Sequence, residues 1–481
     1  MRVLRTLCVA LVVLLIGANS ALAQKWTPLK HQPSFQAGTA LLLTDGTVMV
    51  QDAGAQAWWR LTPDIHASYI NGTWTQLASL PAGYSPLYFS SAVLADGRVI
   101  VEGGEYNFFQ SAWTNLGAIY DPLANKWKSV TPPPGWANIG DAQSVILNDG
   151  TYMQANAVNT QQAVLNAANL TWTQVGSGKQ DRFDEEGWTL LPDGTVLTVD
   201  AINAPNAEKF IPSTQKWISA GNTIVSLEDP GSQEIGPALL RPDGTVFATG
   251  GTGHTAIYTP PPDPMQPGTW TVGPDFPKVN NQQLDIADGP AALLPSGNVL
   301  CAASPGAQFH APVHMFEYDG TKLTEVVATP NSPNDASYND TMLVLPTGQV
   351  LLTDQSNDVE VYTPTGKPNP AWAPRITGVK KTLMRGQSYQ IGGTLFNGLS
   401  SGAAYGDDAQ MATNYPIVAL YNKATKHIFF ARTHDHSSMA VANPNPVSTH
   451  FDVPANAETG PSYIIVVANG IRSNLVAVTI Q

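Results

Sequence analysis

Cysteine and charge are both scarce in this sequence of 481 residues. Cys8 and Cys301 are its two cysteines, and 13% of the residues are charged. Cys8 lies in a segment that we expect to be removed, so an intramolecular disulfide is excluded. Lysine and arginine total 24 against 37 acidic residues, which gives a net charge of −13. This balance argues against nucleic acid or an anionic membrane surface as a partner.

Long apolar runs are missing beyond the N-terminus. Arg2 and Arg5 precede a short apolar run, and Ala21, Leu22 and Ala23 supply the small residues of a cleavage site. Residues 1–23 are therefore predicted to be a signal peptide, since the run is too short to span a bilayer. We expect a protein that is secreted or periplasmic after cleavage, does not insert into a membrane and is monomeric.

An internal repeat dominates the rest of the chain. Each copy has a short apolar run, a two-residue turn and a Val-rich segment, the pattern of a β-hairpin. Later segments of the copies carry a tyrosine and then a tryptophan. Four short strands in about 50 residues predict one blade of a kelch-type propeller. The seven turns are Asp45-Gly46, Asp96-Gly97, Asp149-Gly150, Asp193-Gly194, Asp243-Gly244, Ser296-Gly297 and Thr347-Gly348.

The predicted fold class is all-β: a seven-bladed kelch-type β-propeller over residues 24–372, followed by an immunoglobulin-like β-sandwich over 373–481. The segment Lys25 to Thr27 contains a tryptophan like that of a last strand, yet it precedes the first hairpin. We expect it to complete the seventh blade, which would leave no open sheet edge. After about Arg375 the repeat stops, and two strands around Asn469 and Gly470 favour the sandwich.

Acidic residues recur at one position of the repeat. Eight residues before the hairpin turn stand Tyr88, Asp141, Glu185, Asp288 and, in the last copy, Asn339. In a propeller this position lies where the innermost strands begin, next to the channel. Carboxylates that meet there suit Ca²⁺, Mg²⁺ or Mn²⁺, or general acid–base work on a sugar. The alternative is that each acid caps a strand or bonds a backbone amide. Neighbouring positions add Gln36, Asp184, Glu186, Glu234 and Tyr338.

Two segments carry a resemblance to a known family. Residues 88–97, which begin Tyr-Phe-Ser-Ser, and residues 338–346, which begin Tyr-Asn-Asp-Thr, resemble stretches of galactose oxidase and its relatives, the copper radical oxidases. That family holds copper with two tyrosines and two histidines, and one tyrosine is cross-linked to a cysteine. The resemblance implies that Tyr88 matches the cross-linked tyrosine and Tyr338 the axial one. Asn339 replaces a histidine, and Gln36 and Ala37 stand where the cysteine is expected.

The last copper ligand of the family comes from a C-terminal hairpin that enters the channel. Residues 432–439 resemble that hairpin, so His436 matches the ligand, with His434 as the alternative. A structural role for both histidines at a domain interface stays open. The polar and aromatic segment 404–416 suits a surface that docks on the propeller or touches a ligand, or a linker between strands. Phe108 and Phe109 either stack on sugar rings or fill gaps between blades.

Three functions follow, and a protein-binding scaffold stays open as a fourth. The first is a secreted glycan-binding propeller that has lost the copper-radical chemistry. The second is a lyase or hydrolase that uses Tyr88, Asp141, Glu185, Asp288 and His436 as catalytic residues, with or without a hard divalent cation. The third is a copper-dependent alcohol or aldehyde oxidase with an altered ligand set of Tyr88, Tyr338 and His436. The expected ligand is a carbohydrate or another small extracellular molecule, and copper is not expected.

Overall fold

The computed structural model describes residues 24–306, 310–406 and 411–481. The predicted signal peptide lies outside the described residues. Within them the chain is all-β, with two single-turn 3-10 helices, η1 (Ser337–Asn339) and η2 (Pro370–Trp372). No helix in this described part is long and apolar enough to cross a membrane.

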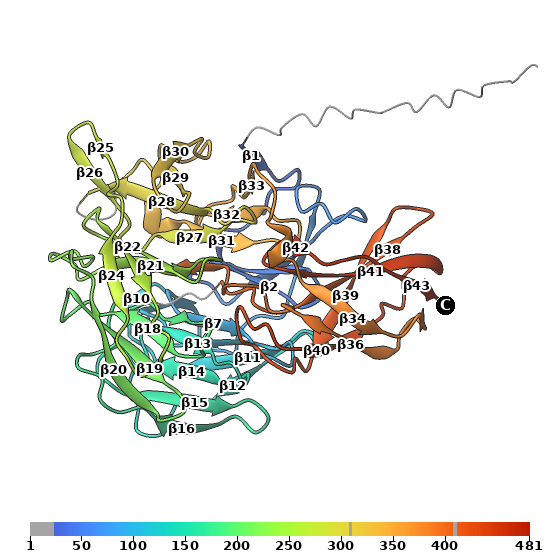
Figure 1. Cartoon of the computed structure of the whole chain (residues 1–481), viewed down its shortest axis with the longest axis horizontal. Coiled ribbons are helices and arrows are strands. Elements are labelled where there is room, and N and C mark those ends of the chain that lie inside the picture. Colours follow the sequence, from blue (N-terminus) through green and yellow to red (C-terminus); the bar gives the residue numbers. More distant parts are fainter. Residues whose placement is uncertain (1–23, 307–309, 407–410) are drawn as a thin grey trace, which may run out of the picture.

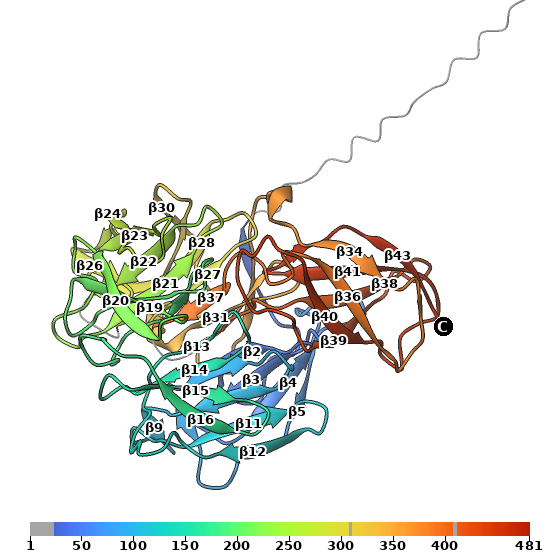
Figure 2. The same ribbon diagram turned by 60° about the horizontal axis from the view of Figure 1, so that its bottom comes forward.

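Seven four-stranded antiparallel units, one per sequence repeat, are arranged around a centre in the described part of the chain (Figures 1 and 2). The predicted seven-bladed propeller is thereby confirmed. Blades 1 to 3 consist of β2 (Ala37–Leu42), β3 (Val48–Asp52), β4 (Trp58–Thr62) and β5 (Thr73–Gln76); β7 (Ser90–Val93), β8 (Val99–Glu102), β11 (Gly117–Asp121) and β12 (Lys126–Val130); and β13 (Ser144–Ile146), β14 (Tyr152–Ala155), β15 (Gln162–Asn166) and β16 (Thr171–Val175).

The remaining blades repeat this order, and blade 7 takes its last strand from the N-terminus. Their strands are β17 (Thr189–Leu190), β18 (Val196–Val199), β19 (Asn206–Ile211) and β20 (Lys216–Asn222); β21 (Ile235–Leu240), β22 (Val246–Gly250), β23 (Thr255–Thr259) and β24 (Thr269–Val272); β27 (Pro290–Leu293), β28 (Val299–Pro305), β29 (His314–Tyr318) and β30 (Leu323–Val326); and β31 (Thr341–Val344), β32 (Val350–Thr353), β33 (Glu360–Thr363) and β1 (Lys25–Pro28).

Short-range chemistry explains why each copy folds as it does. In the first hairpin Gly46 has φ 75°, a value that favours glycine, and the Asp45 carboxylate accepts the Thr47 backbone N–H at 3.0 Å. The repeated tryptophans join neighbouring blades. Trp127 Nε1 in blade 2 donates to Ala78 O at 2.9 Å, and Trp172 Nε1 in blade 3 donates to Thr131 O at 2.8 Å. Trp127 and Trp172 therefore each have a backbone partner in the connection from the preceding blade, whereas Trp217 Nε1 in blade 4 donates to the Gln162 side chain at 2.7 Å.

The N-terminal strand closes the ring. Strand β1 pairs antiparallel with β33, with Trp26 opposite Tyr362. The Trp26 ring packs on Tyr362 with centroids 5.0 Å apart, and its Nε1 donates to Val327 O at 2.8 Å. The prediction that residues 25–27 complete the seventh blade is therefore confirmed.

The C-terminal strands form a second unit at one side of the ring (Figure 2). Strand β39 pairs with β38 through its first half and with β40 through its second. The immunoglobulin-like sandwich stays a prediction. The strands of this unit are β34 (Arg375–Val379), β35 (Thr382–Leu383), β36 (Ser388–Thr394), β38 (Ile417–Asn422), β39 (Ile428–His434), β40 (Val447–Asp452), β41 (Gly460–Ala468), β42 (Ile471–Arg472) and β43 (Val476–Ile480).

One strand from the C-terminal part enters the ring. Strand β37 (Ala403–Tyr405) pairs antiparallel with β27, the innermost strand of blade 6, and places Tyr405 opposite Pro290. Figure 2 shows β37 among the inner strands. Three further short segments lie at the end of the ring where the innermost strands begin: β6 (Pro86–Leu87) pairs with β9 (Tyr106–Asn107), which pairs with β10 (Gln110–Ser111). Strands β25 (Lys278–Val279) and β26 (Gln282–Asp285) extend blade 6.

Candidate functional site

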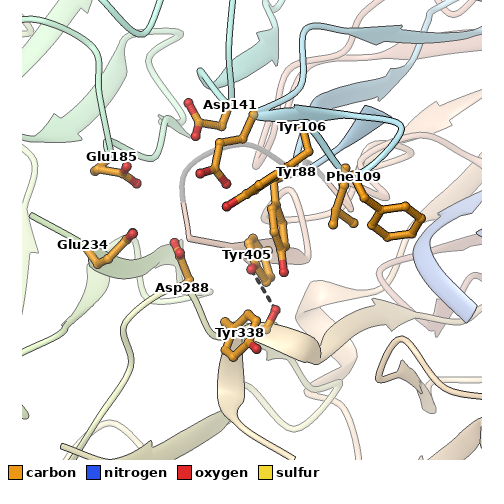
Figure 3. Close-up of a pocket in the computed structure, with 11 residues that line it drawn as sticks. Tyr88, Tyr106, Phe109, Asp141, Glu185, Glu234, Asp288, Tyr338 and Tyr405 are labelled. Atoms are coloured by element: carbon orange, nitrogen blue, oxygen red, sulfur yellow. Dashed lines mark hydrogen bonds between the residues drawn. The ribbon is translucent and has the colours of Figure 1, made fainter. Parts of the chain in front are cut away.

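A cavity of about 490 Å³ opens where the innermost strands begin. Figure 3 shows acidic side chains on one side of it and tyrosines on the other. Six blades, 2 to 7, and the inserted strand β37 contribute to its wall, so residues far apart in the sequence meet here. The lining residues are Leu87, Tyr88, Glu105, Tyr106, Phe109, Asp141, Glu185, Glu234, Asp288, Tyr338 and Tyr405.

Three of these side chains share a position in the repeat and an unusual backbone. Tyr88, Glu185 and Asp288 have φ values of 49°, 59° and 52°. Residues other than glycine rarely adopt this left-handed backbone conformation, which costs on the order of 1 kcal/mol or more per residue. The surrounding strands hold the strain, and its effect is to turn each side chain towards the cavity (Figure 3). The prediction that Tyr88, Asp141, Glu185 and Asp288 face one volume agrees with this geometry.

Three carboxylates are close enough to share one ion. Oxygens of Glu185, Glu234 and Asp288 lie within 4.8 Å of one another. Burial raises the pKa of Asp288 to about 6. Burial and then the charge of Asp288 raise the pKa of both Glu185 and Glu234. At neutral pH these groups must therefore share protons or be neutralised by a bound cation.

Asp141 extends this acidic wall. It is 6% exposed and lines the cavity, and within the described residues its Oδ1 has no hydrogen-bond partner. Burial, and then the charge of Glu185, raise its pKa well above the ordinary value. A buried acceptor without a partner costs about 1–3 kcal/mol, so an external donor or cation at this oxygen would stabilise the site.

Glu105 and Tyr106 come from a segment between β8 and β11. Burial raises the pKa of Glu105 to about 7, and the charges of Asp288 and Asp184 add to this effect. The charge of Glu105 is in turn the main cause of a raised pKa at Tyr106. A carboxyl group that titrates near neutral pH, beside a phenol that stays protonated, supplies one proton acceptor and one donor.

The tyrosines form the opposite wall. The rings of Tyr88 and Tyr405 are parallel to within 12°, with centroids 6.4 Å apart. Tyr405 Oη donates to the backbone O of Tyr338 at 2.8 Å, and the Gln355 side-chain amide donates to Tyr88 Oη at 3.2 Å. Tyr88 and Tyr338, the two residues that the family resemblance selects, thus line the same cavity.

A buried ion network supports the loop that carries Glu185. Lys179 Nζ lies 2.9 Å from Glu186, 2.8 Å from Glu208 and 3.5 Å from Asp200, and it also pairs with Asp181. Burial opposes the charge of Lys179, but these carboxylates together raise its pKa. The ammonium group therefore takes the place that a metal ion would need among Asp181, Glu186 and Asp200, and it fixes the backbone next to Glu185.

His436 is not at the cavity, which corrects the prediction that it joins Tyr88 and Tyr338 there. Its backbone N–H donates to Ala95 O at 3.1 Å, and its Nδ1 contacts Thr449 Oγ1 at 2.8 Å. Ala95 and Tyr88 lie just beyond opposite ends of β7, about 23 Å apart if the chain rises 3.3 Å per residue.

The end of β39 and the residues after it contact the hairpin turns of blades 1 to 3 and do not line the cavity. Thr433 N and Met439 N donate to Thr44 O and Asn148 O, at 3.1 and 2.9 Å. Burial lowers the pKa of His436 to about 3, so it is a neutral residue in the interface. The side chain of His434 contacts Asp435 and Asp452, which both belong to the C-terminal unit.

Sequence reasoning missed part of the wall. Glu105 and Tyr106 lie on a blade 2 insertion that the repeat alignment does not cover, and Leu87 lies in β6, directly before Tyr88. Phe109, for which stacking on a sugar ring and filling a gap between blades are the predicted alternatives, lies on the same insertion. Tyr405 belongs to the 404–416 segment, for which docking on the propeller and a linker role are equal alternatives. Residues 404 and 405 dock on the propeller, where they pair with β27. The unusual polar and aromatic composition of that segment was the one available signal. Residues 407–410 lie outside the described residues.

The donor set does not fit the copper site of the resembling family. Among the described residues that line the cavity there is no imidazole and no thiol. Asn339 ends η1 and is not in the lining. Cys301 is fully buried in β28, and burial raises the pKa of its thiol. Carboxylate and phenol oxygens are hard donors and suit Ca²⁺, Mg²⁺ or Mn²⁺ better than copper.

Seven antiparallel blades, six of them with a tryptophan in the outer strand, define a kelch-type β-propeller. No family model matches the chain. Among curated proteins it is similar to the Kelch-like protein terF of Aspergillus terreus, with 30% identity over 131 residues. That match covers 26% of this chain and about a quarter of the relative's length.

Among solved structures it is similar to a fungal alcohol oxidase of the AA5 family in complex with copper. The TM-score is 0.55 at 13% identity, over 95% of this chain and all of that one. The fold is therefore galactose oxidase-like. A virginiamycin B lyase from Staphylococcus aureus matches over 71% of this chain, with a TM-score of 0.49 and 11% identity.

Proposed function

We propose that this chain is a secreted glycan-binding propeller whose cavity takes a hard divalent cation and a neutral sugar. The observation that carries the proposal is the cluster of Glu185, Glu234 and Asp288 within 4.8 Å, opposite a wall of tyrosines. The unpartnered Asp141 Oδ1 in the same cavity is a second, independent sign of a missing donor or cation.

The cation would link protein and sugar. Three carboxylates supply part of the six to eight oxygens that Ca²⁺ takes, and a pair of sugar hydroxyls completes such a set well. Glu185, Glu234 and Asp288 would hold the ion, and their excess negative charge would be neutralised by it. Binding of the cation and of the sugar should therefore be coupled.

Charge and shape favour a neutral ligand. No lysine or arginine stands among the described lining residues, while five carboxyl groups do. A uronic acid or a sulfated sugar would meet like charge without a counter-ion, which is unfavourable. The half-buried rings of Tyr88 and Tyr106 offer flat apolar faces on which the C–H face of a neutral sugar can stack.

Loss of the copper-radical chemistry is part of the same proposal, because the cavity offers neither imidazole nor thiol among its described residues. Secretion through residues 1–23 is a further part of it. So is a boundary between propeller and C-terminal unit in the connection 364–374, which joins β33 to β34. N-terminal sequencing of protein recovered from the producing cells, and from their medium, tests the cleavage.

An acid–base enzyme is a second candidate. Glu105 and Tyr106 lie together on the blade 2 insertion, and Asp288 lies across the cavity from Tyr106 (Figure 3). Proton donors and acceptors on two sides of one ligand suit a lyase or hydrolase. Formation of reducing ends or of unsaturated products from a neutral polysaccharide would support this candidate over simple binding.

The test is calorimetric. Protein stripped with EDTA is titrated with Ca²⁺, Mn²⁺ and Mg²⁺, and then with neutral mono- and oligosaccharides with and without the best cation. We expect one cation per chain and a sugar affinity that depends on it. Glu185→Gln should remove both, whereas Glu325→Gln, an exposed acid on the outer strand β30, should change neither. Absence of cation binding in the wild type, or equal binding by Glu185→Gln, would reject the proposal.

A further inference from the structure

Blade 2 has an insertion at the mouth of the cavity. Residues 103–116 separate β8 from β11, whereas residues 53–57 suffice at this point in blade 1 and residues 251–254 in blade 5. The insertion forms the hairpin of β9 and β10, which pairs with β6. It provides Glu105, Tyr106 and Phe109 to the cavity wall.

The tip of this hairpin carries two phenylalanines in a strained turn. Phe108 and Phe109 have φ values of 52° and 57°. A two-residue turn with both φ values positive is the type I′ turn, which strongly prefers asparagine and glycine. The rings are also exposed, 47% for Phe108 and 58% for Phe109. Backbone preference disfavours phenylalanine at both turn positions, and exposure of the two rings to water is unfavourable as well. The needs of folding therefore do not explain why phenylalanine stands at 108 and 109.

The turn is held firmly in place. Phe108 N donates to Ser85 O at 2.9 Å, and Ser85 N donates to the Asn107 side chain at 2.7 Å. The ring of Phe109 lies against Gly54, where an added Cβ would approach it to 2.5 Å. The two rings are therefore presented on a fixed support, and both stay largely exposed although Phe109 contacts Gly54 of blade 1.

Phe109 lies at the far side of the tyrosines from the acidic cluster. In Figure 3 Glu185 and Glu234 are at one side of the cavity, Tyr88 and Tyr106 lie between, and Phe109 is at the other side. A ligand that fills the cavity and continues past Tyr106 reaches this tip. The rest of its length would lie in solvent at the rim.

We propose that Phe108 and Phe109 are a second subsite, on which the next ring of a neutral oligosaccharide stacks while its terminal ring occupies the cavity. This inference rests on the proposed function and narrows the ligand from a single sugar to a chain. Stacking on an aromatic face contributes a modest gain per ring and needs no charge, which matches a tip that carries none. The occupant is the same glycan because the hairpin that bears the tip also forms the cavity wall.

The experiment compares chain lengths. Wild type and the double variant Phe108→Asn, Phe109→Gly are titrated with glucose, mannose, xylose and galactose, and with the neutral di-, tri- and tetrasaccharides built from each. Asparagine and glycine suit the turn, so the variant should fold with an unchanged or higher Tm. We expect the ratio of tetrasaccharide to monosaccharide affinity to fall about tenfold in the variant. Leu123→Asn changes an apolar residue that is even more exposed, at the opposite end of blade 2, and should keep the wild-type ratio.

Two results would overturn the inference while leaving the proposed function intact. One is a wild type that binds monosaccharide and tetrasaccharide equally well. The other is a variant whose affinity ratio stays at the wild-type value, which would leave protein docking as the use of this tip. Wild type that binds no saccharide of any length rejects the proposed function and this subsite with it.

Discussion

Asp288→Asn should make the cation-free protein more stable at pH 8 and at the same time unable to bind a cation. Burial among other acids raises the pKa of Asp288 from 3.8 to about 6. A shift of about two units corresponds to about 3 kcal/mol. Water at the cavity mouth screens part of this, so we expect a gain of about 2 kcal/mol in the free energy of unfolding. Asparagine tolerates the left-handed backbone at this position, where φ is 52°, so the substitution adds no strain.

The sign follows from proton binding. Because the folded pKa of Asp288 lies above the unfolded one, the folded state holds a proton between about pH 4 and pH 6 that the unfolded state has lost. The contribution of Asp288 to the free energy of unfolding is therefore highest below pH 4, falls as pH rises through this window, and stays reduced above it. The asparagine variant lacks this contribution, so its advantage should appear at pH 8 and vanish near pH 4.

Thermal unfolding in EDTA measures the difference. Unfolding entropy is about 2.1 cal/mol/K per residue, so for about 340 residues of propeller 2 kcal/mol corresponds to about 3 °C in Tm. Calcium at 100 times its Kd should then raise wild-type stability by about 2.7 kcal/mol and leave Asp288→Asn unchanged. A variant that is less stable than wild type at pH 8 in EDTA, or an equal response of both proteins to calcium, would refute the electrostatic reasoning.

Three further predictions concern the supports of the cavity. Lys179→Met leaves four buried carboxylates without their cation and should lower the free energy of unfolding, measured with denaturant, by about 3–5 kcal/mol. A loss below about 1 kcal/mol would show that the network is dispensable. Tyr405→Phe removes the hydrogen bond to Tyr338 O and should cost about 1 kcal/mol, while Tyr405→Ala should also weaken sugar binding in the same titration; equal affinity of both variants would exclude Tyr405 from the ligand wall. His436→Gln should lower Tm but leave the cation Kd unchanged, and a weakened Kd would contradict its place at the domain interface.

Most of the propeller could be predicted from the sequence, because the information is local. Each Asp-Gly turn specifies its own hairpin through positive φ, as at Gly46, and the register of the repeat then places the residue eight positions earlier at the start of an innermost strand. For this reason Tyr88, Glu185 and Asp288 were found correctly as a group. Predicting the blades needed no long-range contact other than ring closure, and the tryptophan in the Trp26 segment indicates that contact as well.

The candidate site was predicted only in part, because some of its residues follow no repeat. Glu105, Tyr106 and Phe109 lie on an insertion whose path across the cavity depends on pairing with β6. His436 was assigned to the channel by resemblance alone. The contacts that the structure places at 433–439 are with hairpin turns of three successive blades, and such contacts leave no spacing pattern in the sequence.

The number of blades, the closing strand and the acidic positions at the channel can all be predicted from the amino-acid sequence, since each follows from a period of about 50 residues and from short-range turn chemistry. Which C-terminal segment reaches the centre, and that Tyr405 and not His436 completes the wall, depends on the folded arrangement. That choice depends on how two units separated by hundreds of residues pack together. The free energy of such packing is summed over many weak contacts and is not carried by any single motif.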